Sequence, residues 1–361
     1  MYYLAGDIGG TKALLQLVSC QSENNQLETL AQQRYACADF DSLENIILDF
    51  LHSYSQPSVL VHSACFGLPG PVYSDTVNLT NLPWTVSVDS IKATCGIDHV
   101  HFINDFTAAA LGIDTVSEDE LLPLYLNRSL ISPKANRLVV GAGTGLGIAP
   151  VYFDGHSYLP QASEGGHFDF APISDAQQLL LQWLWQRWEH VSYERLLSGS
   201  GLETLYCFFK IFNISNSYEV LGGSGNTVVK NHFLKNDAMG ALFAEKKINH
   251  SLCEVSAPQI SKMAEEGDEC ALKAVHEFVT IYGAFIGAMT LLWPSANGVY
   301  IAGGVAPKLL KWMQMPFFTQ AYLEKGRMTK LLETTPVFLV ANESLGLNGA
   351  MRHNFSSLAQ K

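Results

Sequence analysis

The sequence predicts an α/β fold on three observations. Apolar segments of strand length alternate with longer segments of helical periodicity along most of the 361 residues. Glycine clusters follow several of the apolar segments, as expected for loops at the edge of a sheet. Apolar residues make up 48% of the chain and charged residues 16%, which is ample for the core of one large domain or of two smaller ones.

The N-terminal third is predicted to hold a hairpin, two further strands and two helices. Apolar strands on either side of a tight glycine turn indicate the hairpin, and apolar residues at helical spacing indicate the first helix, with Asp41 or Ser42 as its N-cap. In chain order, the elements are expected at Tyr2–Ala5 (strand), Asp7–Thr11 (turn), Ala13–Val18 (strand), Ser42–Tyr54 (helix), Ser58–Gly67 (strand), Val100–Ile103 (strand) and from Thr107 (helix).

A second strand–turn–strand unit follows, with strands over Arg137–Val140 and Ile148–Phe153 around a glycine-rich turn at Gly141–Gly147. Both predicted turns carry a glycine-threonine corner, Gly10-Thr11 in the first and Gly143-Thr144 in the second. This similarity indicates two related halves, although the sequence identity between them is too low to define a repeat.

The C-terminal half is predicted to be mainly helical, with two more strands. Its tryptophans are interpreted as packing residues, and the apolar run Val279–Trp293 as a buried helix rather than a membrane span, because it is too short. The residues near 212–258, rich in Asn, Ser, Gly and Lys, are expected to form a loop-rich insertion. The remaining elements are expected at Ala176–His190 (helix, with Trp183, Trp185 and Trp188), Ile260–Trp293 (helix), Gly298–Ala302 (strand) and Pro336–Val340 (strand).

Charge and cysteine content exclude several classes of function. The formal net charge is −12, from 22 basic and 34 acidic residues, which argues against binding nucleic acid or an anionic membrane as the main task. Seven cysteines without a Cys-x-x-Cys pair indicate neither a disulfide framework nor a zinc site. With no signal peptide visible, we expect a cytoplasmic protein. ATP is not excluded, because glycine loops and helix ends can hold phosphate in an acidic protein.

Three glycine-rich segments are candidates for nucleotide binding. The first is Gly6-Asp7-Ile8-Gly9-Gly10-Thr11, whose paired glycines leave backbone N–H groups free to approach phosphate oxygens. Thr11 adds a hydroxyl donor, and Asp7 is a candidate to hold Mg²⁺ through water, because Mg²⁺ dehydrates reluctantly. The alternative is an ordinary glycine hairpin; the spacing is not that of a Walker A loop.

The second and third segments have weaker signals. The second contains Gly143, Thr144 and Gly145, but its spacing and the strand expected after it do not match the dinucleotide fingerprint, so a phosphate-binding hairpin or a plain turn remains. The third contains Gly303 and Gly304 after a strand, which suits a nucleoside lying against bare backbone, although a structural turn explains the pair equally well.

Asn104 and Asp105 form the candidate catalytic pair, just past the end of a predicted strand. Phosphoryl transfer to an alcohol requires a group that orients the hydroxyl and takes its proton, and a carboxylate does this in kinases. The alternative is that Asp105 caps the helix expected from Thr107, a common role for aspartate.

A second polar cluster suits a ligand rich in hydroxyls. Glu164 and His167 lie three residues apart across two glycines, so one turn can direct both side chains at the same ligand. Zinc is the competing ligand, but a third residue at suitable spacing is missing. Glu194 lies in a separate segment, where a surface ion pair with Arg195 is the simpler interpretation.

Six segments, in this order along the chain, resemble the bacterial-type glucokinase family of the actin-like sugar kinase superfamily. They are Gly6–Thr11, Ile103–Ala108, Gly141–Gly147, Glu164–Pro172, His190–Gly199 and Ala302–Pro307. Lys12, Ser163 and Ser200 depart from the residues common in the family, but none of the three replaces an expected hydroxyl ligand. The cysteine-rich zinc motif of related sugar kinases and repressors is absent.

The resemblance implies ATP-dependent phosphorylation of glucose at its C6 hydroxyl, with Asp105 as general base. It implies sugar contacts from Asn104, Asp105, Glu164, His167 and Glu194, Mg²⁺ near Asp7, and phosphate and adenosine contacts from the three glycine segments. It also implies a homodimer and a two-domain, actin-like (ribonuclease H-like) fold with an interdomain cleft. Residues 1–112 plus 341–361 would form the small domain and 113–340 the large one.

Two alternative functions remain open at the level of sequence. The same fold could phosphorylate another hexose, such as mannose or an amino sugar, because the sequence does not reveal the width of the sugar site. A non-catalytic sugar sensor is a different class, and it predicts a damaged base or phosphate loop, whereas both are intact here.

Overall fold

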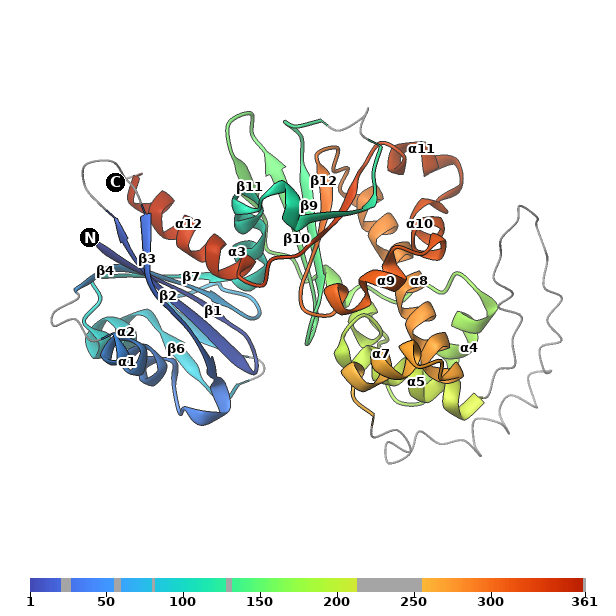
Figure 1. Cartoon of the computed structure of the whole chain (residues 1–361), viewed down its shortest axis with the longest axis horizontal. Helices are drawn as coiled ribbons and strands as arrows, with labels where there is room; N and C mark the ends of the chain where they lie inside the picture. Colours follow the sequence, from blue (N-terminus) through green and yellow to red (C-terminus); the bar gives the residue numbers. More distant parts are fainter. Residues whose placement is uncertain (21–26, 55–59, 80–81, 128–131, 213–254, 360–361) are drawn as a thin grey trace.

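The computed structural model describes residues 1–20, 27–54, 60–79, 82–127, 132–212 and 255–359. Within them, two sheets dominate the architecture (Figure 1). The predicted insertion near 212–258 lies almost entirely outside the described residues. The α/β class predicted from the alternating pattern is confirmed.

The first sheet has five strands in the order β3-β2-β1-β4-β7. The three N-terminal strands form an antiparallel meander, and β4 and β7 then add in parallel to β1. The bounds are β1 Tyr2–Ile8, β2 Lys12–Cys20, β3 Leu27–Ala36, β4 Val61–Leu68 and β7 His99–Asn104; a small separate hairpin joins β5 Thr76–Asn78 to β6 Thr85–Ser87.

The second sheet has six strands in the order β11-β10-β9-β12-β13-β8. It repeats the pairing of the first sheet. Strands β9, β10 and β11 form an antiparallel meander, β12 pairs in parallel with β9, and β13 pairs in parallel with β12. Strand β8 then pairs antiparallel with β13 at the far edge. The shared pairing supports the prediction of two related halves. The bounds are β8 Leu121–Tyr125, β9 Arg137–Ala142, β10 Leu146–Phe153, β11 Tyr158–Pro160, β12 Gly298–Ala302 and β13 Val337–Val340.

Helices cover the first sheet on both faces. Helices α1 (Leu43–Ser53) and α2 (Val88–Cys95) pack on one face, where Ile46, Ile47 and Phe50 are buried, and Ser42 is the N-cap of α1, as predicted. Helices α3 (Asp105–Gly112) and α12 (Leu345–Ala359) cover the other face.

Helix α3 lies between the two sheets (Figure 1). Its Ala108 packs in the cluster formed with α12 and the first sheet, whereas Ala109 and Ala110 pack against strands of the second sheet. The chain therefore passes from one sheet to the other through the helix that starts at Asp105, and it returns from β13 into α12.

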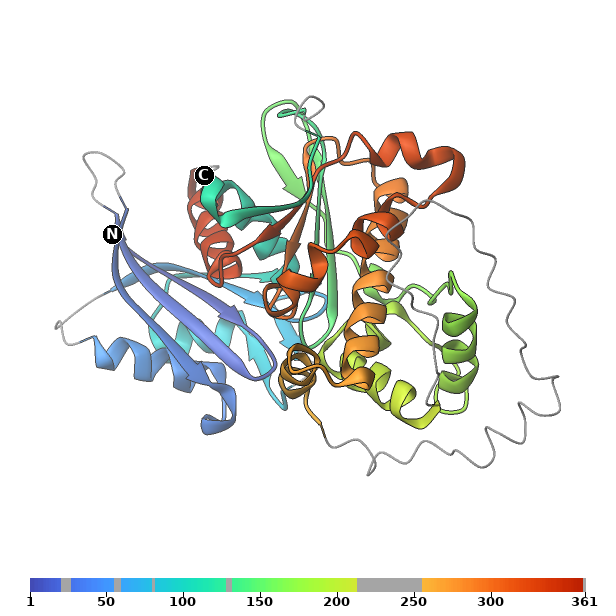
Figure 2. The ribbon, with the colours of Figure 1, turned by 45° about the vertical axis from the view of Figure 1, so that its right-hand side comes forward.

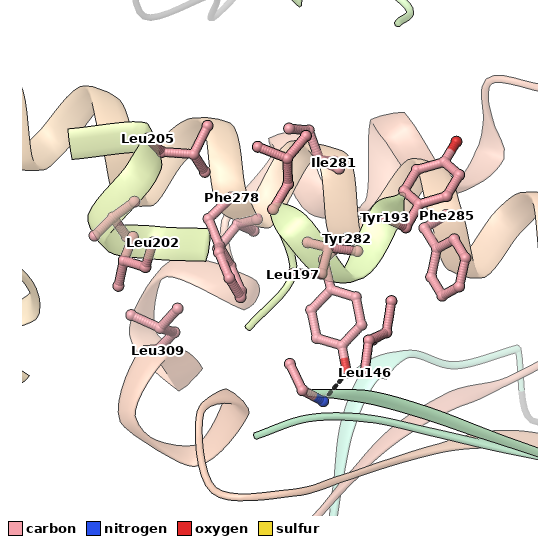
Figure 3. Packing of buried hydrophobic residues seen from close by; sticks show 14 of the residues in the cluster. Leu146, Tyr193, Leu197, Leu202, Leu205, Phe278, Ile281, Tyr282, Phe285 and Leu309 are labelled. Atoms are coloured by element: carbon pink, nitrogen blue, oxygen red, sulfur yellow. Dashed lines mark hydrogen bonds between the residues drawn. The ribbon is translucent and has the colours of Figure 1, made fainter. Parts of the chain in front are cut away.

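The remaining helices pack beside the second sheet around α8 (Glu269–Leu292), as Figure 2 shows. Figure 3 shows the buried side chains where α8 meets this sheet and neighbouring segments. Among the described residues, α8 alone is long and apolar enough to cross a membrane, and 72% of its most apolar window is buried in the protein, which confirms the buried-helix interpretation. The other helices are α4 Asp175–Leu184, α5 Gly199–Phe212, α7 Ala257–Glu265, α9 Leu310–Met313, α10 Pro316–Leu323 and α11 Thr329–Leu332.

Several predicted boundaries were wrong. The predicted helix Ile260–Trp293 is two helices, because Gly267 takes a left-handed conformation (φ 94°) and Asp268 caps a new helix. The predicted helix Ala176–His190 ends at Leu184, and Trp185 is 56% exposed rather than packed. The predicted turn Asp7–Thr11 is shorter, because strand pairing continues through Asp7 and Ile8.

Candidate active site

Asp105 is the first residue of α3, at the edge of the first sheet. The N-cap of this helix is its neighbour: the Asn104 side-chain oxygen accepts a hydrogen bond from the Thr107 backbone N–H at 3.0 Å. The capping role that sequence left open for Asp105 therefore belongs to Asn104. The Asp105 carboxylate accepts instead from the backbone N–H of Phe106 at 2.8 Å and from the amide of Asn104 at 3.1 Å.

The environment of Asp105 raises its pKa to about 7. Burial is the largest cause, because it disfavours the charged carboxylate, and the negative charge of Asp7 is the second. Glu164 adds to the increase, while the hydrogen bond from the Phe106 N–H acts in the opposite direction. A carboxyl group with a pKa near neutrality can both accept and release a proton under physiological conditions, which is what general-base chemistry requires.

Asp7 comes close to Asp105 through the parallel strand order. Its strand β1 pairs with β4, which pairs with β7, and Gly67 of β4 is the register partner of both Asp7 and Ile103. A Cβ atom built on Gly67 would lie 3.7 Å from the Asp105 Cα atom, so Asp7 and Asp105 lie on either side of a residue without a side chain. Gly67 was not singled out from the sequence, since its importance depends on strand order rather than on any local pattern.

The Asp7 carboxylate also faces the first turn of α12. A Cβ atom built on Gly346 would lie 2.8 Å from its Oδ2 atom, so only glycine leaves room there. The positive end of a helix dipole favours an anion at this place. Burial nevertheless raises the pKa of Asp7 to about 6, with the more distant charge of Arg34 acting against it.

The first glycine segment is divided between strand and turn. Gly6, Asp7 and Ile8 belong to β1, where the side chain of Ile8 is fully buried and Gly6 packs against Phe66. The residues Gly9, Gly10 and Thr11 form the corner, of which Thr11 is exposed, and a hydrogen bond from the Gly9 N–H to the Lys12 carbonyl at 2.8 Å closes it. Contacts of this segment with phosphate stay a prediction.

The second glycine segment forms the matching corner between β9 and β10. Gly143, Thr144 and Gly145 are the turn residues, and Thr144 is exposed. The flanking glycines have a different role, because the Phe106 ring occupies the space that Cβ atoms on Gly141 and Gly147 would fill. Phe106, the residue after Asp105, therefore packs against the ends of β9 and β10 that carry this turn, and not against the turn itself.

The third glycine segment, with Gly303 and Gly304, is held against the second. The Val305 N–H donates to the Ala142 carbonyl at 3.2 Å. The N–H of the same Ala142 donates to the hydroxyl of Tyr282 in α8 at 3.2 Å, which Figure 3 shows as a dashed line. Sequence analysis did not find Tyr282; its position in an apolar helix gives no signal of a polar contact with a loop 140 residues earlier.

Glu164, His167 and Glu194 are brought together as one cluster. The His167 Nε2 atom lies 4.0 Å from a Glu164 oxygen and 3.9 Å from Glu194 Oε1. About half of the His167 side chain and of the Glu164 side chain is exposed. The Glu194 side chain is more buried, with 31% of its surface exposed. Two carboxylates on either side of an imidazole offer acceptors and donors to several hydroxyl groups of one ligand.

Two short one-turn helices position this cluster. Gly165–His167 follows Glu164, and Tyr193–Arg195 contains Glu194. The backbone between them is paired, since the Tyr193 N–H donates to the Phe168 carbonyl at 2.9 Å. Arg195 lies over the Trp188 ring at 5.0 Å, so the ion pair that sequence offered as the simpler role for Glu194 is not what the structure shows.

Among the side chains that could bind a metal ion, Asp7 is the candidate ligand for Mg²⁺. In the part of the chain that the structure describes, no group of three His, Cys, Asp or Glu side chains could hold a metal ion by itself. This leaves room for Mg²⁺ at Asp7, because Mg²⁺ is usually held by one or two carboxylates together with phosphate oxygens and water.

Comparison with known proteins gives consistent results. Residues 4–355 match the family model described as Glucokinase. A glucokinase from Nostoc punctiforme is 34% identical over 359 residues, covering 96% of this chain and 97% of the relative. The crystal structure of a glucokinase from an Antarctic psychrotroph superimposes with a TM-score of 0.75 at 26% identity, covering 98% and 99% of the two chains.

A more distant structure shares the fold. A glucokinase of the ROK family from Streptomyces griseus, solved in complex with glucose and AMPPNP, has a TM-score of 0.58 at 19% identity and covers 99% of this chain and 100% of its own. The likeness at this identity concerns the fold, which is the predicted two-domain, actin-like sugar kinase fold.

Proposed function

The chain belongs to the glucokinase family and is an ATP-dependent kinase for glucose, and we propose that Asp105 is its general base at the C6 hydroxyl. The observation that carries this proposal is the position of Asp105. It is partly buried, relieved of helix capping by Asn104, and held with a pKa of about 7 beside Asp7 and Glu164.

The proposed reaction involves one proton transfer, one bond formed and one bond broken at this site. As the C6 oxygen attacks the γ-phosphorus of ATP, the Asp105 carboxylate accepts the hydroxyl proton. A bond forms between the sugar oxygen and phosphorus, and the bond from phosphorus to the β,γ-bridging oxygen breaks, which gives glucose 6-phosphate and ADP. Two hydrogen bonds, from the Phe106 N–H and the Asn104 amide, fix the carboxylate for this transfer.

The cluster of Glu164, His167 and Glu194 is proposed to bind the remaining sugar hydroxyls. Its spacing supports this role, because both carboxylates lie about 4 Å from His167 and all three side chains keep solvent access. The side-chain oxygen of Asn104 is proposed to accept a hydrogen bond from a sugar hydroxyl. The side-chain nitrogen already donates to the Gly70 carbonyl and to the Asp105 carboxylate.

The glycine corners are proposed to bind the nucleotide. Gly9, Gly10 and Thr11 on one side, and Gly143, Thr144 and Gly145 on the other, would hold the phosphates through backbone N–H and hydroxyl donors. Gly303 and Gly304 would face the nucleoside. Asp7 would hold Mg²⁺ through water, and Mg²⁺ would neutralise charge on the transferring phosphoryl group.

The two sheets with their helices are proposed as the two domains, residues 1–112 plus 341–361 and residues 113–340. The chain crossings after α3 and before α12 support this division. A homodimer and a cytoplasmic location are proposed on family membership alone.

A coupled assay for glucose 6-phosphate tests the function, with purified protein, Mg²⁺-ATP and a panel of glucose, mannose and glucosamine. We expect the highest kcat/KM for glucose. Turnover of another hexose alone would keep the mechanism and change the substrate. Sugar binding by calorimetry without turnover of any hexose would contradict the proposal in favour of a sensor.

A further inference from the structure

We propose that Glu194 is shared between the two substrate sites, so that one carboxylate both binds the sugar and fixes the phosphate loop at Gly143–Leu146. The inference rests on the proposed function and adds to it a mechanical link between glucose and nucleotide binding. It makes Gly145, a residue of the phosphate loop, a determinant of glucose affinity.

The two oxygens of Glu194 point to different partners. Oε1 lies 3.9 Å from the Nε2 atom of His167, in the sugar cluster. Oε2 accepts a hydrogen bond from the backbone N–H of Leu146 at 3.0 Å, at the end of the glycine turn. A charge-assisted hydrogen bond of this kind is stronger than one between neutral groups. The carboxylate therefore cannot move in one site without moving in the other.

Gly145 is the residue that makes this contact possible. A Cβ atom built on it would lie 2.5 Å from Glu194 Oε2, closer than any real contact allows. The atom in the way is the end of a flexible side chain, so an alanine is expected to displace the carboxylate rather than disrupt the backbone. Gly143, two residues earlier in the same turn, has nothing within 4 Å of its Cβ position and is a matched control.

A second contact ties the same two segments together. The Gly199 N–H, at the start of α5, donates to the Gly143 carbonyl at 2.9 Å. Together with the Leu146 contact, it holds the turn on both sides of Thr144. Residues 194–199 thus position the exposed threonine that is proposed to meet phosphate, and a sugar bound at Glu194 would order this turn in advance of ATP.

The first experiment measures glucose affinity of G145A and G143A by calorimetry, without nucleotide. We expect G145A to raise the Kd for glucose about tenfold, because a positioned charged hydrogen bond is lost. We expect G143A to remain within about twofold of the wild type. Equal affinities of the two variants and the wild type would overturn the inference, while failure of the wild type to bind glucose would instead overturn the proposed function.

The reciprocal experiment measures AMPPNP affinity of E194A and E164A without sugar. Each variant removes one carboxylate of the sugar cluster, but of these two carboxylates only that of Glu194 accepts a hydrogen bond from the turn. We expect weaker AMPPNP binding by E194A than by E164A. Equal Kd values would show that the carboxylate does not hold the loop. Thermal unfolding of all four variants separates misfolding from local effects, and the reciprocal pair remains informative if G145A does not fold.

Discussion

Asn104 donates its side-chain amide to the Asp105 carboxylate at 3.1 Å while its side-chain oxygen caps helix α3. Two adjacent residues thus divide two tasks that sequence could not separate. Because the cap is supplied by asparagine, the aspartate is available to a substrate hydroxyl. The same contact orients the carboxylate, so, if Asp105 is the base proposed above, Asn104 is expected to affect catalysis through Asp105 as well as through any contact with sugar.

Replacing Asn104 with alanine should therefore lower both stability and turnover. Loss of the N-cap is expected to cost about 1 kcal/mol of unfolding free energy. Loss of the amide contact is expected to lower kcat, because the Asp105 carboxylate is left with fewer restraints. Ser42→Ala is the matched control, since Ser42 caps α1 through a hydrogen bond from the Asn45 N–H at 3.3 Å, away from the site. If both variants lose stability and neither loses kcat, Asn104 has no positioning role.

Asp105→Asn keeps the shape of the side chain and removes the base. We expect kcat to fall by about 10²- to 10⁴-fold, the usual contribution of a positioned general base. The Kd for glucose should change much less, because the other proposed sugar ligands remain. Steady-state kinetics together with calorimetry separates the two effects. Near-normal turnover by this variant would exclude Asp105 as the base.

The activity should depend on the protonation of Asp105. Because burial and then Asp7 raise its pKa to about 7, the fraction in the carboxylate form increases as pH rises through that value. The kcat/KM for glucose, which reports the free enzyme, should therefore rise with pH up to a plateau above neutrality.

Asp7→Asn tests the physical cause of this pKa. Removing the charge of Asp7 removes the second largest contribution, so the Asp105 midpoint should move to lower pH. Carboxyl ¹³C NMR titration of the free protein measures the midpoint directly, independently of any effect on turnover. A midpoint that stays in place would show that Asp7 does not act on Asp105 electrostatically.

Tyr282→Phe should affect ATP more than glucose. The variant leaves the buried Ala142 N–H without its acceptor, which costs about 1–3 kcal/mol of stability. Because Ala142 also holds the third glycine segment through Val305, the KM for ATP is expected to rise. Tyr322→Phe removes an equally buried hydroxyl that donates to Leu332 and Thr335, remote from the glycine segments. An equal KM for ATP in both variants would show that Tyr282 contributes to stability but not to ATP binding.

Local sequence patterns determined most elements and most candidate residues of this protein. Alternation and glycine turns located both hairpins, and apolar periodicity located α1 and its cap at Ser42, because these features depend on neighbours a few residues apart. Breaks were harder to place. The sequence shows Gly267, but it does not show that this glycine takes the left-handed conformation that ends one helix before the next begins.

Tertiary structure alone decided how the candidate residues act together. The pairing of Asp7 with Gly67 and of Gly67 with Ile103 depends on strand order, which no local pattern reveals. The hydrogen bonds of Glu194 to Leu146 and of Tyr282 to Ala142 join residues 48 and 140 positions apart. Such contacts follow from how helices and sheets pack, and packing is a property of the whole chain rather than of any segment.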